Sequence, residues 1–500
     1  MGMYTMTSPR CDPEARREGE ARIDALVGAR LSQQGISPAP SCSDEVFVRR
    51  VFLDVIGTLP TAREARAFLA DKRPDKRTTL IDRLLWRDEF ADYWAMKWCD
   101  LLRVKSEFPI DLWPMAAQAY HGWIRTSVRQ NMPYDRFVRT LLTASGSNFT
   151  NPPVNFFRAV QSKKPETISR AVALTFMGSR AEKWPKSRLT GMSGFFSQVG
   201  YKYTGEWKEE IVFFDASKPA GGRAFPDGKP VRVVPDRDPR DAFADWLITP
   251  SNPWFTLNIV NRIWYWLLGR GIVHEPDDIR ADNPAQNPAL LTWLQSELVK
   301  SNYNLRHIYK IILNSAAYQR ASSSAGAKNA DTNFARYSLR RLDAEVLIDA
   351  LNQVTGTTES YSSPIPEPFT FIPESQRSIS LPDGSISSSF LEMFGRPPRD
   401  SGLESERNNR PTADQRLHLL NSSHIQRKIE RGPNISALVR PGTLQQEIGD
   451  ELYLSILSRF PTEAERTVLG LYFQHAATRR DAVIDIAWAL INSAEFMYKH

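Results

Sequence analysis

Hydrophobic residues recur along much of the chain with the spacing of amphipathic helices. In residues 12–33, Ile23, Val27 and Leu31 fall on one side of a helix. The same kind of spacing predicts further helices at 43–57, 88–104, 112–131, 133–144 and 164–178. The pattern therefore predicts a helical region that extends to about residue 180.

The pattern changes over residues 200–235, which contain two β-rich runs, EIVFFD and PVRVVP. Asp227 and Gly228 lie just before the second run and form a dipeptide typical of a hairpin turn. We expect a small β element here that connects two helical blocks. Asp238 and Pro239 then provide a capping residue and a proline at the first position of the next helix.

Helical spacing resumes in the second half of the chain. It predicts helices at 239–248, 254–268, 287–301, 304–319 and 342–354, and again from Thr412 onward. Residues 355–410 between them are rich in Ser, Pro and Arg, and a loop of this length is usually functional or disordered. The predicted fold class is mainly α, a multi-helix two-domain protein. Its predicted parts are 1–42 (N-terminal helix and linker), 43–200 (first helical domain), 201–237 (β-rich connector) and 238–500 (second helical domain).

One internal repeat accompanies this pattern. FLDVIGTLPTAREA at 52–65 aligns with YLSILSRFPTEAER at 453–466, and in both a Pro-Thr pair is followed three residues later by a capping Glu. We expect the same three-helix unit at both ends of the chain.

Composition excludes several classes of protein. The net charge of +7 is spread over 500 residues, and Lys and Arg alternate with Asp and Glu as on solvated helix faces, so nucleic-acid binding is not expected. There is no run of 18 apolar residues, so no transmembrane helix is expected. The N-terminus lacks the hydrophobic run of a signal peptide, so either the protein is cytoplasmic or a signal peptide has been removed.

Six longer blocks carry a resemblance to a known type of protein. DEVFVRRVFLDVIGTLPT, DKRTTLIDRLL and MPYDRFVRTLL resemble the cytochrome-associated domain of unknown function described from planctomycetes (PSCyt type). DPRDAFADWLITPSNPWFTLNIVNRIWYWLLGRGIV, ILNSAAYQRAS and LHLLNSSHIQRKI resemble its usual partner domain (PSD type). The resemblance covers about residues 43–200 and 238–497 and implies a bacterial protein exported to the periplasm. It implies no established activity.

The chain departs from this type at the haem-attachment motif. Relatives often carry CxxCH after the position of Phe176-Met177-Gly178, where this chain reads SRAEKWPKSRLTGMSGFF. Covalent c-type haem requires two thiols and an axial His, so it is not expected here. The three cysteines, Cys11, Cys42 and Cys99, form no CxxC pair, and we expect Cys99 to be a buried thiol. The cofactor, if there is one, is not specified by the sequence.

The best candidate site is the segment 396–424. Its candidate catalytic residues are Glu404, Glu406 and His418, and its candidate binding residues are Arg396, Arg399, Arg407, Asn408, Asn409 and His424. Carboxylates near a histidine are suited to acid–base catalysis or to divalent metal binding. Alternatively, the arginines neutralise these carboxylates and hold the loop on the helical body. His418 and His424 are six residues apart, which argues against a paired-His zinc site on one helix.

Two weaker signals complete the set. Asp277, Asp278 and Asp282 supply oxygen ligands suited to calcium, although no DxDxDG loop is present. Aromatic residues are dense at Trp94 and Trp98 and at 254–266, where the helical spacing favours core packing over sugar stacking.

Three functional hypotheses follow. The first is a non-catalytic scaffold or interaction protein whose partner is an envelope protein or a polysaccharide. The second is a hydrolase on glycans or a related polymer that uses segment 396–424, and it predicts that Glu404, Glu406 and His418 converge in an open cleft. The third is a redox protein that binds haem non-covalently. No GxSxG, P-loop or GxGxxG motif supports nucleophilic hydrolysis or nucleotide use.

Overall fold

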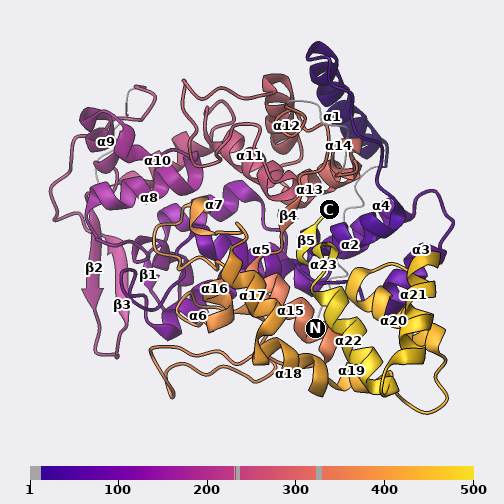
Figure 1. Ribbon diagram of the computed structural model, residues 1–500. Coiled ribbons are helices and arrows are strands. Elements are labelled where there is room, and N and C mark those ends of the chain that lie inside the picture. Colours follow the sequence, from indigo (N-terminus) through magenta and orange to yellow (C-terminus); the bar gives the residue numbers. More distant parts are fainter. Residues whose placement is uncertain (1–12, 230, 232–236, 323–328) are drawn as a thin grey trace, which may run out of the picture.

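The computed structural model describes residues 13–229, 231, 237–322 and 329–500. The described chain is 55% helix and 4% strand, which confirms the mainly α fold class (Figure 1). The helices of the first block, with 3-10 helices marked η, are α1 (Pro13–Gln33), α2 (Asp44–Val55), α3 (Ala62–Ala70), α4 (Lys76–Leu85), α5 (Asp88–Leu101), α6 (Pro114–Arg129), α7 (Tyr134–Thr143), η1 (Pro152–Phe157), α8 (Pro165–Met177), η2 (Ala181–Lys183) and α9 (Lys186–Ser193).

The second block begins at residue 239. Its helices are α10 (Pro239–Ile248), α11 (Phe255–Leu268), α12 (Pro288–Lys300), α13 (Leu305–Asn314), α14 (Ala316–Gln319), α15 (Ala344–Thr355), η3 (Ser378–Ser380), α16 (Ser389–Met393), η4 (Glu404–Glu406), α17 (Ala413–Asn421), α18 (Ser423–Arg431), α19 (Pro433–Ala437), α20 (Gln445–Leu457), α21 (Glu463–His475), α22 (Arg479–Ile491) and α23 (Ala494–Met497). The single helix predicted over 304–319 is divided, because Ser315 is extended and its hydroxyl caps α14.

The β element is a three-stranded antiparallel sheet in the order β1 (Gly146–Ser147), β3 (Glu210–Phe214) and β2 (Val199–Tyr203). β3 is the predicted run EIVFFD, but its hairpin partner is β2, which precedes it. The predicted second run, PVRVVP at 230–235, lies almost entirely outside the described residues. Asp227 and Gly228 do lie at a turn, where Gly228 has a φ of +79°. The described hairpin is therefore β2–β3, and a hairpin at Asp227-Gly228 stays a prediction.

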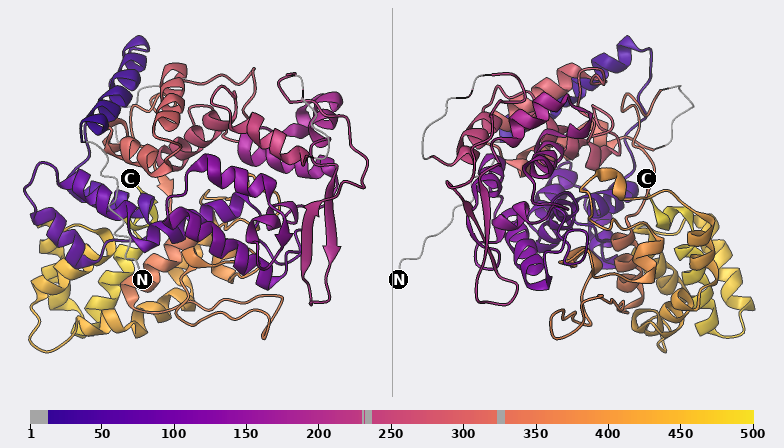
Figure 2. Two further views of the ribbon diagram at one scale, coloured as in Figure 1. Left: turned by 180° about the vertical axis from the view of Figure 1, so that it is seen from behind. Right: turned by 90° about the vertical axis from the view of Figure 1, so that its left-hand side faces the viewer.

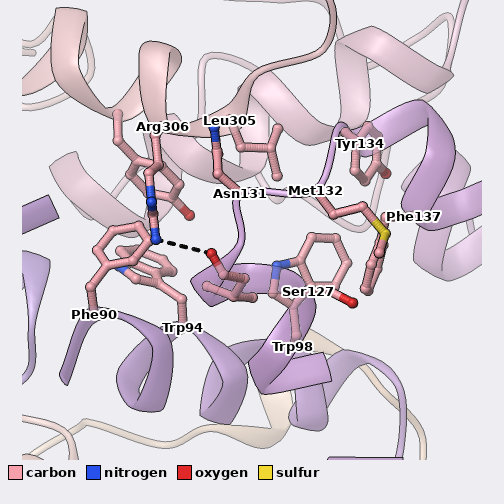
Figure 3. A pocket seen from close by; sticks show the side chains of 12 residues that line it. Phe90, Trp94, Trp98, Ser127, Asn131, Met132, Tyr134, Phe137, Leu305 and Arg306 are labelled. Carbon is pink, nitrogen blue, oxygen red and sulfur yellow. Dashed lines mark hydrogen bonds between the residues drawn. The ribbon is translucent and has the colours of Figure 1, made fainter. Parts of the chain in front are cut away.

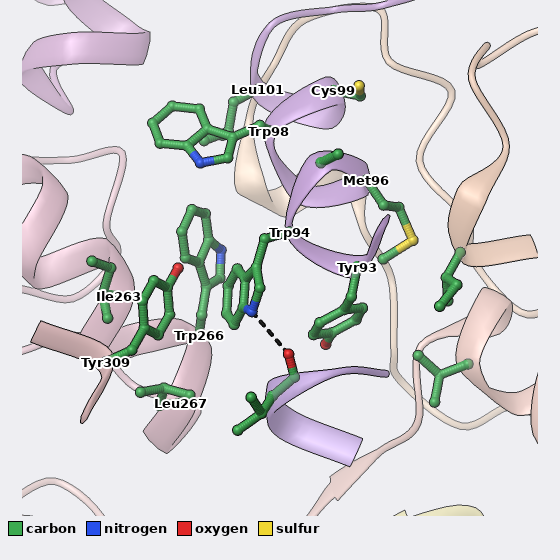
Figure 4. Close-up of a cluster of buried hydrophobic side chains, with 14 of the residues drawn as sticks. Tyr93, Trp94, Met96, Trp98, Cys99, Leu101, Ile263, Trp266, Leu267 and Tyr309 are labelled. Atoms are coloured by element: carbon green, nitrogen blue, oxygen red, sulfur yellow. Dashed lines mark hydrogen bonds between the residues drawn. The ribbon is translucent and has the colours of Figure 1, made fainter. Parts of the chain in front are cut away.

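One hydrophobic core runs through both blocks (Figure 4). Trp94 of α5 lies at its centre, with its ring 5.3 Å from that of Trp266 in α11 and 4.4 Å from that of Tyr309 in α13. The indole nitrogen of Trp94 donates to the carbonyl of Val55 at 3.0 Å. Trp98 is buried as well, so the predicted core position of these two tryptophans is confirmed.

Residues near 500 return to the beginning of the fold, where Figure 1 places the C-terminus beside α2 and β4. β5 (Tyr498–Lys499) pairs with β4 (Arg340–Arg341). Arg50 of α2 donates to the carbonyl of His500 at 2.9 Å, and Lys499 lies 3.0 Å from Asp54. The helices from α17 onward gather on one side of the molecule (Figure 2).

The two Pro-Thr repeats both form capping boxes. Thr61 and Glu64 cap α3, and Thr462 and Glu465 cap α21 in the same way. A shared three-helix arrangement around them stays a prediction. Among the described residues, no helix is long and apolar enough to cross a bilayer.

Candidate functional site

A cavity of about 670 Å³ opens where α5 of the first block meets the second block; we name it the central cleft. Its lining residues are Tyr93, Lys97, Tyr265, Trp266, Gly269, His274, Glu275, Leu339, Arg340, Arg341, Asp343, Glu404, Ser405, Arg407, Asn408, Asn409, Arg410, Pro411, Tyr498 and Lys499. This combination of aromatic rings with a limited set of polar groups is typical of ligand sites, and the volume falls in their usual range.

Glu404 lies on one wall of the central cleft, in the short helix η4. Its carboxylate accepts a hydrogen bond from the indole nitrogen of Trp266 at 3.1 Å and lies 3.3 Å from Arg262. Burial raises the pKa of Glu404, and the nearby Arg262 only partly opposes this. A carboxyl group with a raised pKa keeps its proton to a higher pH than an exposed glutamate does, which is the property of a general acid.

Asp343 lies in the same cleft, at the N-cap position of α15. Its carboxylate accepts hydrogen bonds from Lys97 at 2.9 Å, from Asn409 at 2.6 Å and from the Tyr93 hydroxyl at 3.2 Å. Burial favours the neutral acid, but the cations Lys97, Arg407 and Lys499 outweigh it and hold the pKa of Asp343 well below its usual range. One cleft therefore holds two carboxyl groups with opposite pKa shifts.

A second buried carboxylate supports the floor of the cleft. Asp54 of α2 accepts hydrogen bonds from Tyr318 at 2.9 Å, from Tyr337 at 2.7 Å and from Lys499 at 3.0 Å. Lys499 and Arg340 both line the cleft and are paired to this carboxylate, so α2 fixes their positions.

Several polar atoms on the cleft wall are left without a hydrogen-bond partner. Among the described residues, the buried atoms Nε of Arg340, Nη1 of Arg341, Oδ1 of Asn409 and Nδ1 of His274 have none. Each of these residues lines the central cleft. Because buried polar groups are almost always paired, these four atoms are exceptions to the usual pattern.

The predicted convergence of Glu404, Glu406 and His418 in one cleft is not found. Glu404 lines the central cleft, whereas His418 lines a separate cavity. The carboxylate of Glu406 accepts a hydrogen bond from the backbone N–H of Ser401 at 2.6 Å, and burial raises its pKa. The two glutamates, two residues apart, are the ends of the single 3-10 turn η4, so they do not share a face as an extended segment would allow.

The arginines of the segment hold it to the helical body. Arg399 lies 2.9 Å from Asp100 of α5, and Arg407 lies 2.6 Å from both Asp100 and Glu345. Arg396 is buried and donates to the carbonyl of Asp383 at 3.1 Å. Arg399 and Arg407 thus neutralise Asp100 of α5 and Glu345 of α15. The sequence had suggested that the arginines neutralise Glu404 and Glu406.

The two asparagines of the segment have different roles. Asn409 donates to Asp343 in the central cleft. The backbone carbonyl of Asn408 accepts from Arg341 at 3.1 Å, and its side chain accepts from the N–H of Arg410. Asn409 is therefore the one of the two whose side chain contacts a candidate acid–base group.

His418 and His424 face each other beside a second cavity of about 430 Å³, which we name the histidine cavity. It is lined by Glu359, Ser360, Tyr361, Ser362, Ser388, Ser389, His418 and His424. The two histidines lie on different helices, α17 and α18, which meet at Ser422. The sequence argument against a paired site assumed one continuous helix, and the turn at Ser422 removes that assumption.

The three aspartates at 277–282 point to cationic side chains. Asp277 is buried and lies 2.7 Å from Arg262. Asp278 and Asp282 both contact Arg280, at 3.1 Å and 2.6 Å. Within the described parts of the chain, no group of three or more His, Cys, Asp or Glu side chains is arranged to hold a metal ion. The calcium interpretation therefore gains no geometric support.

A third cavity is enclosed by aromatic rings near α5, α6 and α13 (Figure 3). It measures about 40 Å³ and is lined by rings that include Phe90, Trp98 and Phe137, with Met132 beside them. Arg306 closes one side and donates to the Val128 carbonyl at 3.1 Å. A volume of this size corresponds to a few water molecules at most, which is far too small for haem.

Sequence reasoning missed Asp343, Lys97 and Glu359. Asp343 directly precedes the apolar run of α15, and Lys97 lies on the buried face of α5. A lysine at a core position of an amphipathic helix is the signal that would have indicated a buried partner. Glu359 lies in a polar segment and carries no such signal.

Two family matches cover most of the chain. Residues 22–188 match PSCyt2, described as a protein of unknown function (DUF1549). Residues 239–473 match PSD1, also described as a protein of unknown function (DUF1553). No curated protein and no solved structure matches the chain.

Proposed function

Because the chain is a PSCyt2 domain followed by a PSD1 domain, whose descriptions carry no activity, we propose a function from the central cleft, which residues of both domains line. We propose that the protein is a hydrolase that acts on a glycan or a related polymer. The observation that carries the proposal is the pair of carboxyl groups, Glu404 and Asp343, whose pKa values are shifted in opposite directions in one open cleft.

The chemistry follows from these shifts. The protonated carboxyl of Glu404 donates its proton to the bridging oxygen of the scissile bond as that bond breaks. A water molecule attacks the carbon and transfers its proton to the ionised Asp343. One product gains a hydrogen on the former bridging oxygen, and the other gains a hydroxyl group on the attacked carbon. Proton exchange with solvent then restores both carboxyl groups. Opposite pKa shifts of two neighbouring carboxyls are the recurring pattern of such acid–base pairs.

The cleft lining supports a sugar polymer as the substrate. Tyr265 and Tyr498 are half-buried rings at the cleft, and rings of this kind pack against the C–H faces of sugars. The side chains of Asn408 and Arg410 line the cleft and are exposed, so they are suited to contact hydroxyl groups. Because polymeric glycans are encountered outside the cytoplasm, we propose a periplasmic or exported location, which cell fractionation would test.

The proposal is tested with a panel of neutral, uronate-bearing, sulfated and amino-sugar polymers, by measuring the release of reducing ends. E404Q is expected to lower kcat by about 10²–10⁴-fold, the usual contribution of a general acid. E463Q is the control, because Glu463 is exposed on α21 and does not line the cleft. Its activity should stay close to that of the unmodified protein.

The pH profile gives a second readout. Activity should fall as the pH rises through the raised pKa of Glu404, because the acid form is then lost. The E404Q variant should lack this limb. Equal activity of E404Q and the unmodified protein would refute the role of Glu404, and the absence of both binding and cleavage across the panel would overturn the glycan proposal.

A second candidate function, docking of an envelope partner protein, has one observation in its favour. α21 contributes no buried side chain among its described residues, and Val468, Leu471 and Tyr472 are exposed along one face of it. Such an apolar stripe is typical of a protein interface. If this face docks a partner, L471E should abolish co-purification of a defined envelope protein, whereas the neighbouring polar change T467E should not.

A further inference from the structure

His418 and His424 form an arrangement that the proposed acid–base site does not use. The Nε2 atom of His418 lies 3.4 Å from the Nδ1 atom of His424. The histidine cavity shares no lining residue with the central cleft. An inference about this pair is therefore independent of the proposed hydrolase.

The separation of the two nitrogens fits zinc coordination. It is longer than the usual hydrogen-bond range of about 2.7–3.2 Å. Two nitrogens that each lie about 2.05 Å from a tetrahedral zinc ion are about 3.3–3.4 Å apart. Adjacent ligands of a square-planar copper site would be about 2.9 Å apart, so the observed distance favours zinc.

Glu359 fixes the orientation of one imidazole. Its Oε2 atom lies 2.9 Å from Nε2 of His424, the ring nitrogen that points away from His418. This contact places the proton of His424 on Nε2 and leaves a lone pair on Nδ1. Glu359 also contacts Lys428 at 3.0 Å, so its negative charge is partly balanced before any metal binds. A carboxylate behind a metal-binding histidine is a recurring feature of zinc sites.

The surroundings keep His418 in the form that binds metal. Burial lowers its pKa, and the neighbouring His424 lowers it further, whereas Glu359 has the opposite effect. The ring of Phe390 lies 5.9 Å from that of His418 and 6.0 Å from that of His424, so an apolar wall supports the pair. A neutral imidazole at physiological pH is required for coordination.

We propose that His418 and His424 bind a zinc ion through Nε2 and Nδ1, with Glu359 as the residue that positions His424. The described residues hold no third protein ligand there, so the remaining coordination positions face the histidine cavity. Water or an oxygen-bearing ligand that enters the cavity would fill them. Catalytic zinc sites commonly have three protein ligands and one open position, so this site would leave one position more to water or a ligand.

The test uses the whole protein, stripped of metal with a chelator and titrated with zinc by calorimetry, with the bound metal measured by elemental mass spectrometry. One zinc per chain is expected. H418Q and H424Q should each abolish this binding, and E359Q should weaken it by about 10–100-fold. H475Q is the control, because His475 is exposed on α21. Each variant is first compared with the unmodified protein by thermal unfolding.

The outcomes are distinguishable. Cobalt in place of zinc should give the intense visible bands of a tetrahedral site, and H418Q and H424Q should remove them. No zinc at one equivalent, or zinc binding that survives in either H418Q or H424Q, would overturn the site. Zinc binding that also disappears in H475Q would assign the metal to the surface. None of these results depends on whether the central cleft hydrolyses a glycan.

Discussion

Arg407 is expected to be one of the residues on which the stability of the fold depends most. It is 6% exposed and lies 2.6 Å from Asp100 and 2.6 Å from Glu345, so one cation joins α5, α15 and the segment before α17. R407M would leave these buried carboxylates without their main counter-charge. Breaking a buried ion pair by removing one partner costs about 3–5 kcal/mol.

This cost can be converted into a melting temperature. Unfolding entropy is about 2.1 cal/mol/K per residue, so the 500-residue chain gains about 1 kcal/mol/K if it unfolds as one unit, as its continuous core implies. R407M should therefore lower the Tm by about 3–5 °C in differential scanning calorimetry. R410M is the matched control, because Arg410 is exposed three residues away and should change stability by no more than about 0.5 kcal/mol.

The pH dependence provides the stricter test. Burial alone would raise the pKa of Asp100, but Arg407 and Arg399 outweigh it, and the folded-state pKa is lowered. A group whose folded pKa is depressed contributes stability above its unfolded pKa of about 3.9 and loses it as the pH falls. The Tm difference between R407M and the unmodified protein should thus be largest at pH 7 and shrink below about pH 4. A difference of less than 1 °C at pH 7, with R410M unchanged, would refute the reasoning.

Three further predictions follow from other positions. G178A should lower the Tm, with a loss of about 1–3 kcal/mol in the free energy of unfolding. Gly178 has a φ of +58°, and an added Cβ would lie 2.8 Å from the Pro276 carbonyl oxygen. G470A is the control and should not lower the Tm, because an added Cβ there would meet nothing within 4 Å. Cys99 should react with Ellman's reagent only after denaturation, because it is buried and burial raises its pKa to about 12. D54N should lower the free energy of unfolding, measured by urea denaturation, by about 3–5 kcal/mol, because Lys499 would lose its buried counter-charge. An unchanged free energy of unfolding in D54N would contradict this prediction.

The helices were predictable because their information is local. The spacing of Ile23, Val27 and Leu31 is enough to define α1, and the Thr61 and Thr462 capping boxes appear in the structure as the sequence indicates. The pairing of β3 with β2 was not predicted, because strand pairing depends on which segments meet and leaves no local signal. The division at Ser315 was missed because a serine is compatible with both a helix interior and a cap.

The candidate site was predictable only in part. Glu404 was recognised from its place in a charge-dense segment, and it does line the central cleft. Asp343 lies 61 positions earlier and lines the same cleft only because of the packing of α15 against the first block. His418 and His424 were recognised separately, but their contact depends on the turn at Ser422, which residue spacing cannot reveal. Pairings of this kind depend on tertiary structure and leave no periodic pattern in the sequence.

The contacts between α2 and residues 498–500 have a consequence for how the protein is made. Arg50 and His500 are separated by 450 positions, and Lys499 and Asp54 by 445. At about 5–20 residues per second, a ribosome needs roughly 20–90 s to add a stretch of that length. Until then Asp54 lacks Lys499 and Arg50 lacks the His500 carbonyl, so the buried charges of α2 are only partly compensated. α2 therefore completes its contacts only when the last strand is added, and a chaperone that shields α2 until then should increase the yield of native protein.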